Sequence, residues 1–514
     1  MTDISSLPVE LLELVLKYAV HGDSVTRVVA PFVCWHWRAL VSSFPTPRPP
    51  HPPANIFWAA AKSGSLPMLK WLRENGCPFN SWACTSAAEG GHLEALQWLR
   101  DSGCPWGDLT GAHAVMNGHM KVLEWMLAHG YPLSPALNQG AARGGFIEIL
   151  EWLRERGCPL DANASDQAAS VGGIKTLEWL KEHGCPIKKS AFGLAAREGR
   201  IEVLKWSIEH GYKLRAKYCA LAAEGEQFET LKWLHESGCP WVANTCTTIA
   251  GKGNLEMLKW ARENECPWAM GTYINAAAGG HLEVLKWARE NGCPLDHKGK
   301  ERMNVCLGAA LSGKLEVLKW ARENGCPWNE SVCEAMASNL EMLKWARANG
   351  CPWNQETFSA AAMAGSIEVL EWLREQGCPW DKEAMGYAAT AGHLKAVKWL
   401  WEAGCPRGVI VCSWAAYTGH LGVLMWLREV GCEWNWETTF QAAREGHLQV
   451  LKWARAHGCD WKEDLFYIAA QNGHLEVVKW ARENGCPGEH NICKGAAEKG
   501  CVEVLQWAKT EGLS

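Results

Sequence analysis

The apolar residues of one short stretch recur with the period of an α-helix. Ile367, Leu370 and Leu373 are three residues apart and predict one buried face. Trp372 is expected on the same inner side, with Val369 at its flank, and charged residues fill the positions between them. The pattern therefore predicts an amphipathic helix that packs against other elements.

A preceding helix and a sharp stop complete the unit. Asn354 is a favourable N-cap, an Ala-rich segment follows it, and Gly365 ends that first helix. The alanines leave room for a neighbouring backbone to approach closely. Gly377 is suited to the left-handed residue after the second helix, and Pro379 prevents its continuation. One unit is thus expected to be a helix–turn–helix pair.

Near-copies of this unit occupy most of the chain. The repeat Trp of each copy is Trp71, Trp98, Trp125, Trp152, Trp179, Trp206, Trp233, Trp260, Trp287, Trp320, Trp345, Trp372, Trp399, Trp426, Trp453, Trp480 or Trp507. The step is 27 residues except for one of 33 before Trp320 and one of 25 after it. Such a period is typical of a stacked-repeat solenoid. We expect about 17 repeats over residues 55–514, with an irregular step near 294–340.

Cysteine follows the same period. Fourteen of the 23 cysteines lie six residues after a repeat Trp, as Cys378 does. Equivalent positions in stacked helices are about 10 Å apart, which is too far for a disulfide. We therefore expect reduced thiols buried just past a helix end. The chain has no Cys-x-x-Cys pair, which argues against a zinc site.

Tryptophan is also placed by the repeat rather than scattered. Of the 32 tryptophans, seventeen are repeat Trp residues and eight follow Cys-Pro or its equivalent. This regularity favours packing between units over a carbohydrate-binding platform. The chain contains no Gly-rich phosphate loop, His-Glu-x-x-His or Gly-x-Ser-x-Gly motif. We expect no enzymatic activity, no cofactor and no metal.

The net charge and the N-terminal sequence limit the expected location and partners of the protein. The net charge of -5 gives no general attraction to nucleic acid or to an anionic membrane. No run of 18 apolar residues is present, so no membrane-spanning helix is expected. The first residues lack the features of a signal peptide. Together with the thiols, this predicts a cytoplasmic or nuclear protein with neither nucleic-acid nor membrane partners.

The repeat text resembles the ankyrin repeat. An Ala-Ala pair is followed by Gly-His-Leu-Glu-Val-Leu-Lys and then by Gly-Cys-Pro, as around His281. An ankyrin repeat has 33 residues with a β-hairpin finger, whereas six residues are missing here between Cys-Pro and the first helix. The resemblance implies an all-α solenoid that largely lacks fingers. Histidines of the motif, such as His447 and His474, are expected to hold the turn between the two helices by hydrogen bonds.

Residues 1–43 precede the repeats and resemble an F-box. Leu7-Pro8 followed by Glu10-Leu11-Leu12, and Val33-Cys34 followed by Trp37-Arg38, match the opening and the close of that motif. F-boxes bind the Skp-type adaptor of cullin ubiquitin ligases. By this resemblance the adaptor-binding residues are Leu7, Pro8, Leu11, Leu12, Val15 and Trp37. Alternatively, these residues only cap the solenoid. Residues 44–54 are rich in proline and predict a stiff linker.

The repeats differ most just before and within their first helices, where a target protein could be recognised. Stacking is expected to bring basic residues of two successive repeats into one patch. The longer step before Trp320 adds further basic residues as candidates. The candidate target-binding residues are Lys188, Lys189, Lys213, Arg215, Lys217, Lys298, Lys300 and Arg302. An acidic partner would fit them, and ordinary solvation is the alternative.

The two-part order resembles F-box/ankyrin-repeat proteins of large DNA viruses and protists. This resemblance implies a non-catalytic adaptor in a host–virus setting: a substrate receptor whose head recruits a ubiquitin ligase through the Skp-type adaptor and whose repeats bind a target protein. The alternative is an ankyrin-type binding scaffold without a link to ubiquitin, in which the head is only a cap.

Overall fold

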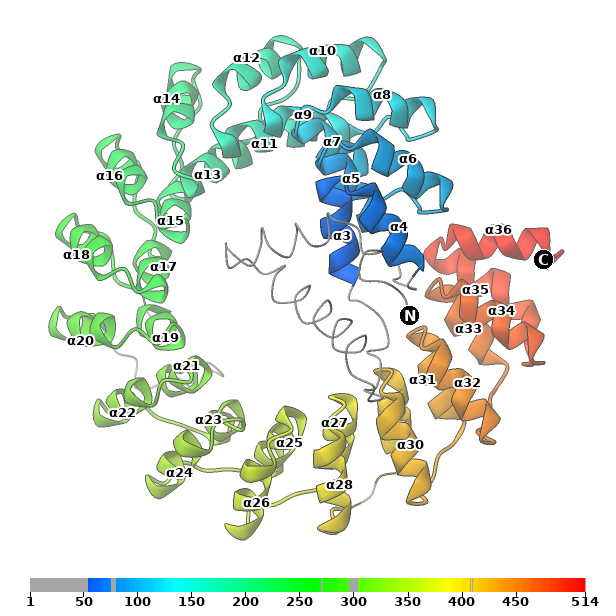
Figure 1. Cartoon of the computed structure of the whole chain (residues 1–514). Helices are drawn as coiled ribbons and strands as arrows, with labels where there is room; N and C mark the ends of the chain where they lie inside the picture. The colour runs from blue at the N-terminus through cyan, green and yellow to red at the C-terminus, as the bar shows by residue number, and fades with distance from the viewer. Residues whose placement is uncertain are drawn as a thin grey trace, which may run out of the picture. The chain divides into compact units, whose positions relative to one another are not determined.

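The described part of the chain is entirely helical. The computed structural model describes residues 54–74, 80–269, 271–294, 304–406, 408 and 410–513. Within them lie 34 α-helices, α3 to α36, the short 3-10 helix η2 (Glu489–Asn491), and no strand. The helices form 17 pairs, which confirms both the predicted number of repeats and the absence of β-hairpin fingers from the described residues (Figure 1).

Contacts divide the chain into two compact units. Unit 1 comprises residues up to Thr245 together with Glu265–Pro267, and unit 2 comprises Cys246–Asn264 and the residues from Trp268 onward. The expected head, 1–43, and residues 44–53 of the expected linker lie outside the described residues.

Unit 1 contains seven helix pairs. Its first helices are α3 (Ala54–Ser63), α5 (Ser81–Glu89), α7 (Thr110–Met116), α9 (Pro135–Gly144), α11 (Asn163–Val171), α13 (Lys189–Arg197) and α15 (Lys217–Glu224). Its second helices are α4 (Leu66–Glu74), α6 (Leu93–Asp101), α8 (Met120–Ala128), α10 (Ile147–Glu155), α12 (Ile174–Glu182), α14 (Ile201–Glu209) and α16 (Phe228–Glu236).

Unit 2 contains the other ten pairs, and its boundary falls inside α17. Its first helices are α17 (Asn244–Lys252), α19 (Gly271–Ala278), α21 (Val305–Ser312), α23 (Glu330–Ala335), α25 (Gln355–Ala364), α27 (Glu383–Thr390), α29 (Val411–Tyr417), α31 (Trp436–Arg444), α33 (Asp464–Gln471) and α35 (Ile492–Lys499). Its second helices are α18 (Leu255–Glu263), α20 (Leu282–Glu290), α22 (Leu315–Glu323), α24 (Leu340–Ala348), α26 (Ile367–Glu375), α28 (Leu394–Glu402), α30 (Leu421–Glu429), α32 (Leu448–Ala456), α34 (Leu475–Glu483) and α36 (Val502–Thr510).

Local signals act at the helix ends as the sequence predicts. The Asn354 side chain caps α25 in a capping box with Thr357. After α26, Gly377 has a φ of 73°, and the amide of Cys378 donates to the carbonyl of Leu373 at 2.9 Å. This bond is the long hydrogen bond of a Schellman motif, which ends the helix.

The buried face of the second helix differs from the prediction. Val369, Leu370 and Leu373 are fully buried, whereas Trp372 and Ile367 are only half-buried. A helix turns by about 100° per residue, so the first three residues share the centre of one face while the other two flank it on opposite sides. The placement of Trp372 in the core and of Val369 at the flank was therefore wrong. Among the repeat Trp residues only Trp179, Trp206 and Trp320 are buried.

Small residues allow the first helices to pack side by side. In unit 1 each first helix from α5 onward contacts the next, and in unit 2 the same holds from α19 to α35 (Figure 1). Ala361 and Ala362 are fully buried in this layer. At Gly140 a Cβ atom would lie 2.4 Å from the carbonyl oxygen of Ala112 on the preceding first helix. The backbones of neighbouring first helices are therefore in close contact, as the Ala-rich sequence predicts.

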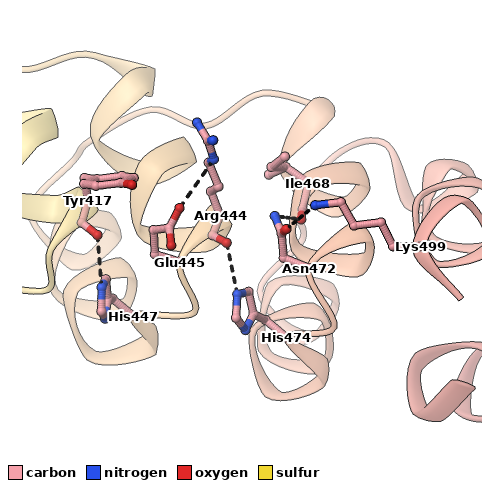
Figure 2. Close-up of polar contacts among 8 residues, drawn as sticks. All are labelled: Tyr417, Arg444, Glu445, His447, Ile468, Asn472, His474 and Lys499. Carbon is pink, nitrogen blue, oxygen red and sulfur yellow. Dashed lines mark hydrogen bonds and ion pairs between the residues drawn. The ribbon is translucent and has the colours of Figure 1, made fainter. Parts of the chain in front are cut away.

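The histidines of the Gly-His motif connect neighbouring repeats. Nε2 of His447 lies 3.1 Å from the carbonyl oxygen of Tyr417, and Nε2 of His474 lies 3.0 Å from that of Arg444 (Figure 2). Each acceptor ends the first helix of the preceding repeat, thirty residues earlier. The hydrogen-bonding role is confirmed, but it spans two repeats and not the turn within one.

The tryptophans also pack across the repeat boundary. Trp353, which follows Cys-Pro, lies edge-on to Trp372 of the next repeat, with 5.9 Å between ring centroids. The guanidinium of Arg347 lies 3.8 Å from the centroid of Trp353. Trp434 and Trp453 repeat this arrangement at 5.7 Å. The prediction that both classes of tryptophan pack between units is thus confirmed for these pairs.

Buried thiols connect the loop after a second helix to the N-cap residue of the first helix in the same repeat. Cys378 is 1% exposed, and its thiol donates to the carbonyl of the N-cap residue Asn354 at 3.5 Å. Cys459 does the same to Asn435 at 3.2 Å. All 21 cysteines of the described residues are free, and 19 of them are buried. This confirms the prediction of reduced thiols just past a helix end.

The irregular step is visible in one helix. Helix α23 has six residues, and the other described first helices have seven to ten. The two residues missing from this repeat are therefore lost from its first helix. The inserted residues of the preceding step lie within 295–303, outside the described residues.

Candidate functional site

The two helix layers differ in how uniform their exposed residues are. On five second helices a Lys pairs with a Glu three residues earlier, as Lys205 pairs with Glu202 at 2.7 Å and Lys286 with Glu283 at 2.9 Å. The exposed positions of the first helices carry different residues in each repeat. Sequence variation is therefore concentrated on the first-helix face.

Five of the predicted target-binding residues lie on this face in unit 1. Lys188 is the N-cap residue of α13 and Lys189 is its first residue. Lys217 is the first residue of α15, and Lys213 and Arg215 lie in the connection that precedes it. These residues, which we call the basic cluster, thus belong to two adjacent helix starts.

Two hydrogen bonds fix these helix starts. The phenol of Tyr218, on α15, donates to the carbonyl of Lys189 at 3.0 Å. Burial raises the pKa of Tyr218, so the phenol remains a protonated donor. The thiol of Cys239 donates to the carbonyl of Arg215 at 3.2 Å. The backbone that carries the cluster is therefore held by the buried layer behind it.

No described residue neutralises the charges of the cluster. The ammonium group of Lys188 donates to the side-chain oxygen of Asn163 at 2.5 Å, which is a neutral partner. Lys189, Lys213, Arg215 and Lys217 are exposed, and no ion pair joins any of the five to another described residue. Helix starts carry a positive partial charge of their own, which adds to the local potential. The cluster is therefore suited to a negatively charged ligand.

The remaining predicted residues lie outside the described part of the chain. They are the insertion residues Lys298, Lys300 and Arg302, and Leu7, Pro8, Leu11, Leu12, Val15 and Trp37 of the head.

One feature of the first-helix face was not predicted from the sequence. Trp414 and Tyr417 on α29 belong to neither of the two periodic tryptophan classes, and Trp436 and Phe440 on α31 are also outside them. These aromatic side chains are exposed or half-buried. A search for aromatic residues that do not recur at the repeat period would have found them.

The described residues form no metal site, and their thiols serve packing. No group of three or more His, Cys, Asp or Glu side chains there is arranged to hold a metal ion. Burial raises the pKa of Cys158 and of Cys293 to about 11, so these thiols are protonated at neutral pH. No helix of the described residues is long and apolar enough to cross a membrane.

Comparison with solved structures gives only weak likenesses. The structure of the pentatricopeptide repeat protein PPR10 from maize aligns with 99% of this chain and 94% of its own at 12% identity and a TM-score of 0.30. PPR10 in complex with an 18-nt psaJ RNA element aligns with 98% of this chain and 90% of its own, also at 12% identity, with a TM-score of 0.31. Scores this low carry no conclusion about a shared ligand.

Comparison with protein families is more specific. No curated protein matches the sequence. The family model for ankyrin repeats, which occur in many copies, matches residues 56–100 in unit 1 and 439–482 in unit 2. Both matches fall on the helix pairs described above. The chain therefore contains ankyrin repeats, built into a solenoid of paired helices.

Proposed function

We propose that this chain is a non-catalytic adaptor that binds a target protein on its first-helix face. We further propose that it is the substrate receptor of a cullin-type ubiquitin ligase, in which residues 1–43 recruit the Skp-type adaptor. The ankyrin repeats support the first part, because such repeats are typically binding scaffolds. The F-box-like residues Leu7, Pro8 and Trp37 support the second part. A cytoplasmic or nuclear location belongs to the same proposal.

The observation that carries the target-binding role is the basic cluster. It places five cations on two adjacent helix starts without an ion pair to another described residue. On the second helices, five lysines pair with a glutamate of their own helix, as Lys205 pairs with Glu202 at 2.7 Å. Unpaired charge at a surface steers association and selects partners by complementarity. An acidic protein segment is the target that fits.

A protein target is favoured over nucleic acid. Non-specific nucleic-acid binding depends on many phosphate contacts by Lys and Arg, whereas the net charge of the whole chain is -5. The cluster is a local exception of five residues and not a basic stripe along the repeats. An RNA competitor nevertheless belongs in the test, since five cations also attract phosphate.

The target-binding role is tested by charge reversal in the full chain. Proteins captured by the tagged wild-type chain are compared with those captured by Lys189→Glu with Arg215→Glu. The matched control, Lys205→Glu with Lys232→Glu, reverses the same number of charges on second helices. We expect loss of a defined protein partner only in the first variant, with excess RNA leaving wild-type capture intact. Equal capture by all three chains would contradict the role, and so would displacement by RNA.

The ligase role is tested separately. Binding of a purified Skp-type adaptor to the full chain is compared with binding to Leu11→Asp. We expect the substitution to abolish binding, because it places a charge in the apolar surface that the F-box resemblance implies. If the wild-type chain does not bind the adaptor, the ubiquitin part fails. The alternative, a scaffold without a ubiquitin link, then stands.

A further inference from the structure

Unit 2 carries a second unusual surface on its first helices. Six aromatic residues that are exposed or half-buried, are not repeat Trp and do not follow Cys-Pro lie on four successive first helices, α27, α29, α31 and α33. We call them the aromatic face: Tyr387, Trp414, Tyr417, Trp436, Phe440 and Tyr467. Each of these helices contacts the next. The six side chains therefore belong to one continuous helix layer.

Aromatic side chains also occur on two first helices of unit 1, where Trp82 of α5 is 51% exposed and lies 6.2 Å from Trp58 of α3. The positions of unit 1 that correspond to Tyr387 and Trp414 nevertheless include Ser86, His113 and Gly140. Packing of the repeat thus does not require an aromatic ring at that position. What distinguishes α27, α29, α31 and α33 within the described residues is that half-buried or exposed rings occur in four consecutive repeats.

The rings are held in place while part of each remains accessible. Trp414 lies edge-on to Tyr387 with 5.5 Å between centroids. A Cβ atom at Gly386, in the middle of α27, would be 2.4 Å from the Trp414 ring, so glycine makes room for it. Tyr417 is 41% exposed, and the other five are half-buried. Ordered aromatic side chains lose little entropy on binding and are enriched in interaction hot spots.

The rings already attract cations from the chain itself. The ammonium group of Lys462 lies 3.8 Å from the centroid of Trp436, and that of Lys494 lies 5.9 Å from the centroid of Tyr467. Nearby, Arg444 pairs with Glu445 at 3.4 Å, and Lys499 donates to the side chain of Asn472 at 2.9 Å (Figure 2). Arg444 is thus paired with a carboxylate, whereas the three lysines keep their charge and are held against a ring or a neutral amide.

Carboxylates at the helix starts are not engaged in this way. Glu437 lies in the first turn of α31 and Asp464 in the first turn of α33, with Glu463 at the N-cap of α33. Within the described residues these three form no ion pair. These three carboxylates are therefore available to cationic side chains of a partner. Such a surface attracts Lys and Arg side chains and repels a phosphate backbone.

We propose that the aromatic face of α27, α29, α31 and α33 binds a basic protein segment. Apolar side chains of that segment pack against Trp414 and Tyr417, while its Lys or Arg side chains reach Glu437, Glu463 and Asp464. This docking surface is separate from the basic cluster of unit 1, which suits a ligand of the opposite charge.

A binding measurement with defined probes tests the proposal. The full chain is titrated against fluorescent peptides in which leucine alternates with arginine or with glutamate, and against oligo-uridine RNA. Fluorescence polarisation in about 0.15 M salt limits non-specific attraction. We expect the arginine peptide to bind at least about tenfold more tightly than either other probe. Equal affinities, tighter RNA binding or no binding of the arginine peptide would overturn the proposal.

Matched variants locate the binding site. Glu437→Lys with Asp464→Lys should weaken the arginine peptide about tenfold, whereas Glu330→Lys with Glu356→Lys, at the starts of α23 and α25, should not. Tyr417→Ser should weaken it about fivefold. Met363→Ser replaces an exposed residue at the equivalent position of α25 and should have no effect. Equal losses in test and control variants would show binding elsewhere and refute the proposal.

The basic cluster provides a further check. Lys189→Glu with Arg215→Glu should leave the affinity for the arginine peptide unchanged. Failure of the aromatic face and failure of the proposed target site are therefore distinguished by different variants.

Discussion

Nε2 of His474 lies 3.0 Å from the carbonyl oxygen of Arg444, the last residue of the first helix in the preceding repeat. A carbonyl only accepts, so Nε2 carries the hydrogen. The imidazole ring rests over Gly446, where a Cβ atom would be 2.6 Å from Nδ1. The glycine of one repeat and the histidine of the next are thus contact partners. The recurring Gly-His sequence motif therefore forms the junction between neighbouring repeats.

We expect His474→Ala to lower the free energy of unfolding by about 1 kcal/mol, the net contribution of one hydrogen bond. The loss should be local, because a repeat contacts mainly its neighbours. Hydrogen exchange should accelerate in α31–α34 and not in unit 1. His457→Ala is the matched control, since that exposed ring contacts the carbonyl of Trp453 within its own helix at 2.8 Å. Equal effects of the two substitutions would contradict the junction role.

Glu226 occupies a turn position that glycine holds in other repeats. Its φ is 59°, and at the equivalent Gly199 it is 73°. A side chain in the left-handed region costs roughly 1–2 kcal/mol. We therefore expect Glu226→Gly to raise the unfolding free energy by about 1 kcal/mol, measured by chemical denaturation of the transition that includes α15 and α16. A decrease in stability would show that the glutamate side chain makes a contribution that outweighs the strain.

The corrected core makes a prediction about side-chain deletions in α26. Leu370 is fully buried, so Leu370→Ala should cost about 3 kcal/mol. Trp372 is half-buried and packs at one edge against Trp353, so Trp372→Ala should cost less, about 1–2 kcal/mol. Denaturant unfolding of both variants compares them directly. A larger loss for the tryptophan would restore the original view that the periodic rings form the core.

The buried thiols predict a dependence on alkaline pH. Burial raises the pKa of Cys459 from its ordinary value of 9.0 to about 11. The unfolded chain ionises first, so the stabilising contribution is complete below about pH 9 and is lost as pH rises through about 11. At pH 8 in the native protein, we expect alkylation of Cys459 to be much slower than that of the half-buried Cys493. Peptide mapping by mass spectrometry measures both rates, and comparable rates would disprove the burial.

Much of the fold could be predicted from the sequence because one sequence motif is repeated along the chain. The helix predicted from Ile367 is observed as Ile367–Glu375, and Asn354 caps α25 as expected. Caps, glycine turns and prolines are local signals, so each copy confirms the others. The number of repeats and the absence of fingers from the described residues followed directly from the period.

Relations between repeats were harder to predict. Trp372 was expected inside because the ring recurs and is apolar, although a rotation of about 100° per residue places Val369, and not Trp372, beside Leu370 and Leu373. The partner of His474 was not predicted, because the repeat period does not say how neighbouring repeats are rotated against each other. For the candidate site, sequence identified the basic cluster but missed the hydrogen bond from Tyr218 to Lys189 that holds it. The aromatic face was not predicted, because its rings do not recur at the repeat period.

The central claim is that partners bind on the first-helix face while the second helices serve packing and solvation. Site-specific photo-cross-linking tests it directly: a cross-linking amino acid is placed at Lys217 or Tyr417 on first helices, or at Lys205 or Lys286 on second helices. The full chain is then exposed to a cell extract and cross-linked proteins are identified by mass spectrometry. The account predicts specific adducts from the first-helix positions only. Adducts that form equally or preferentially at the second-helix positions would contradict it.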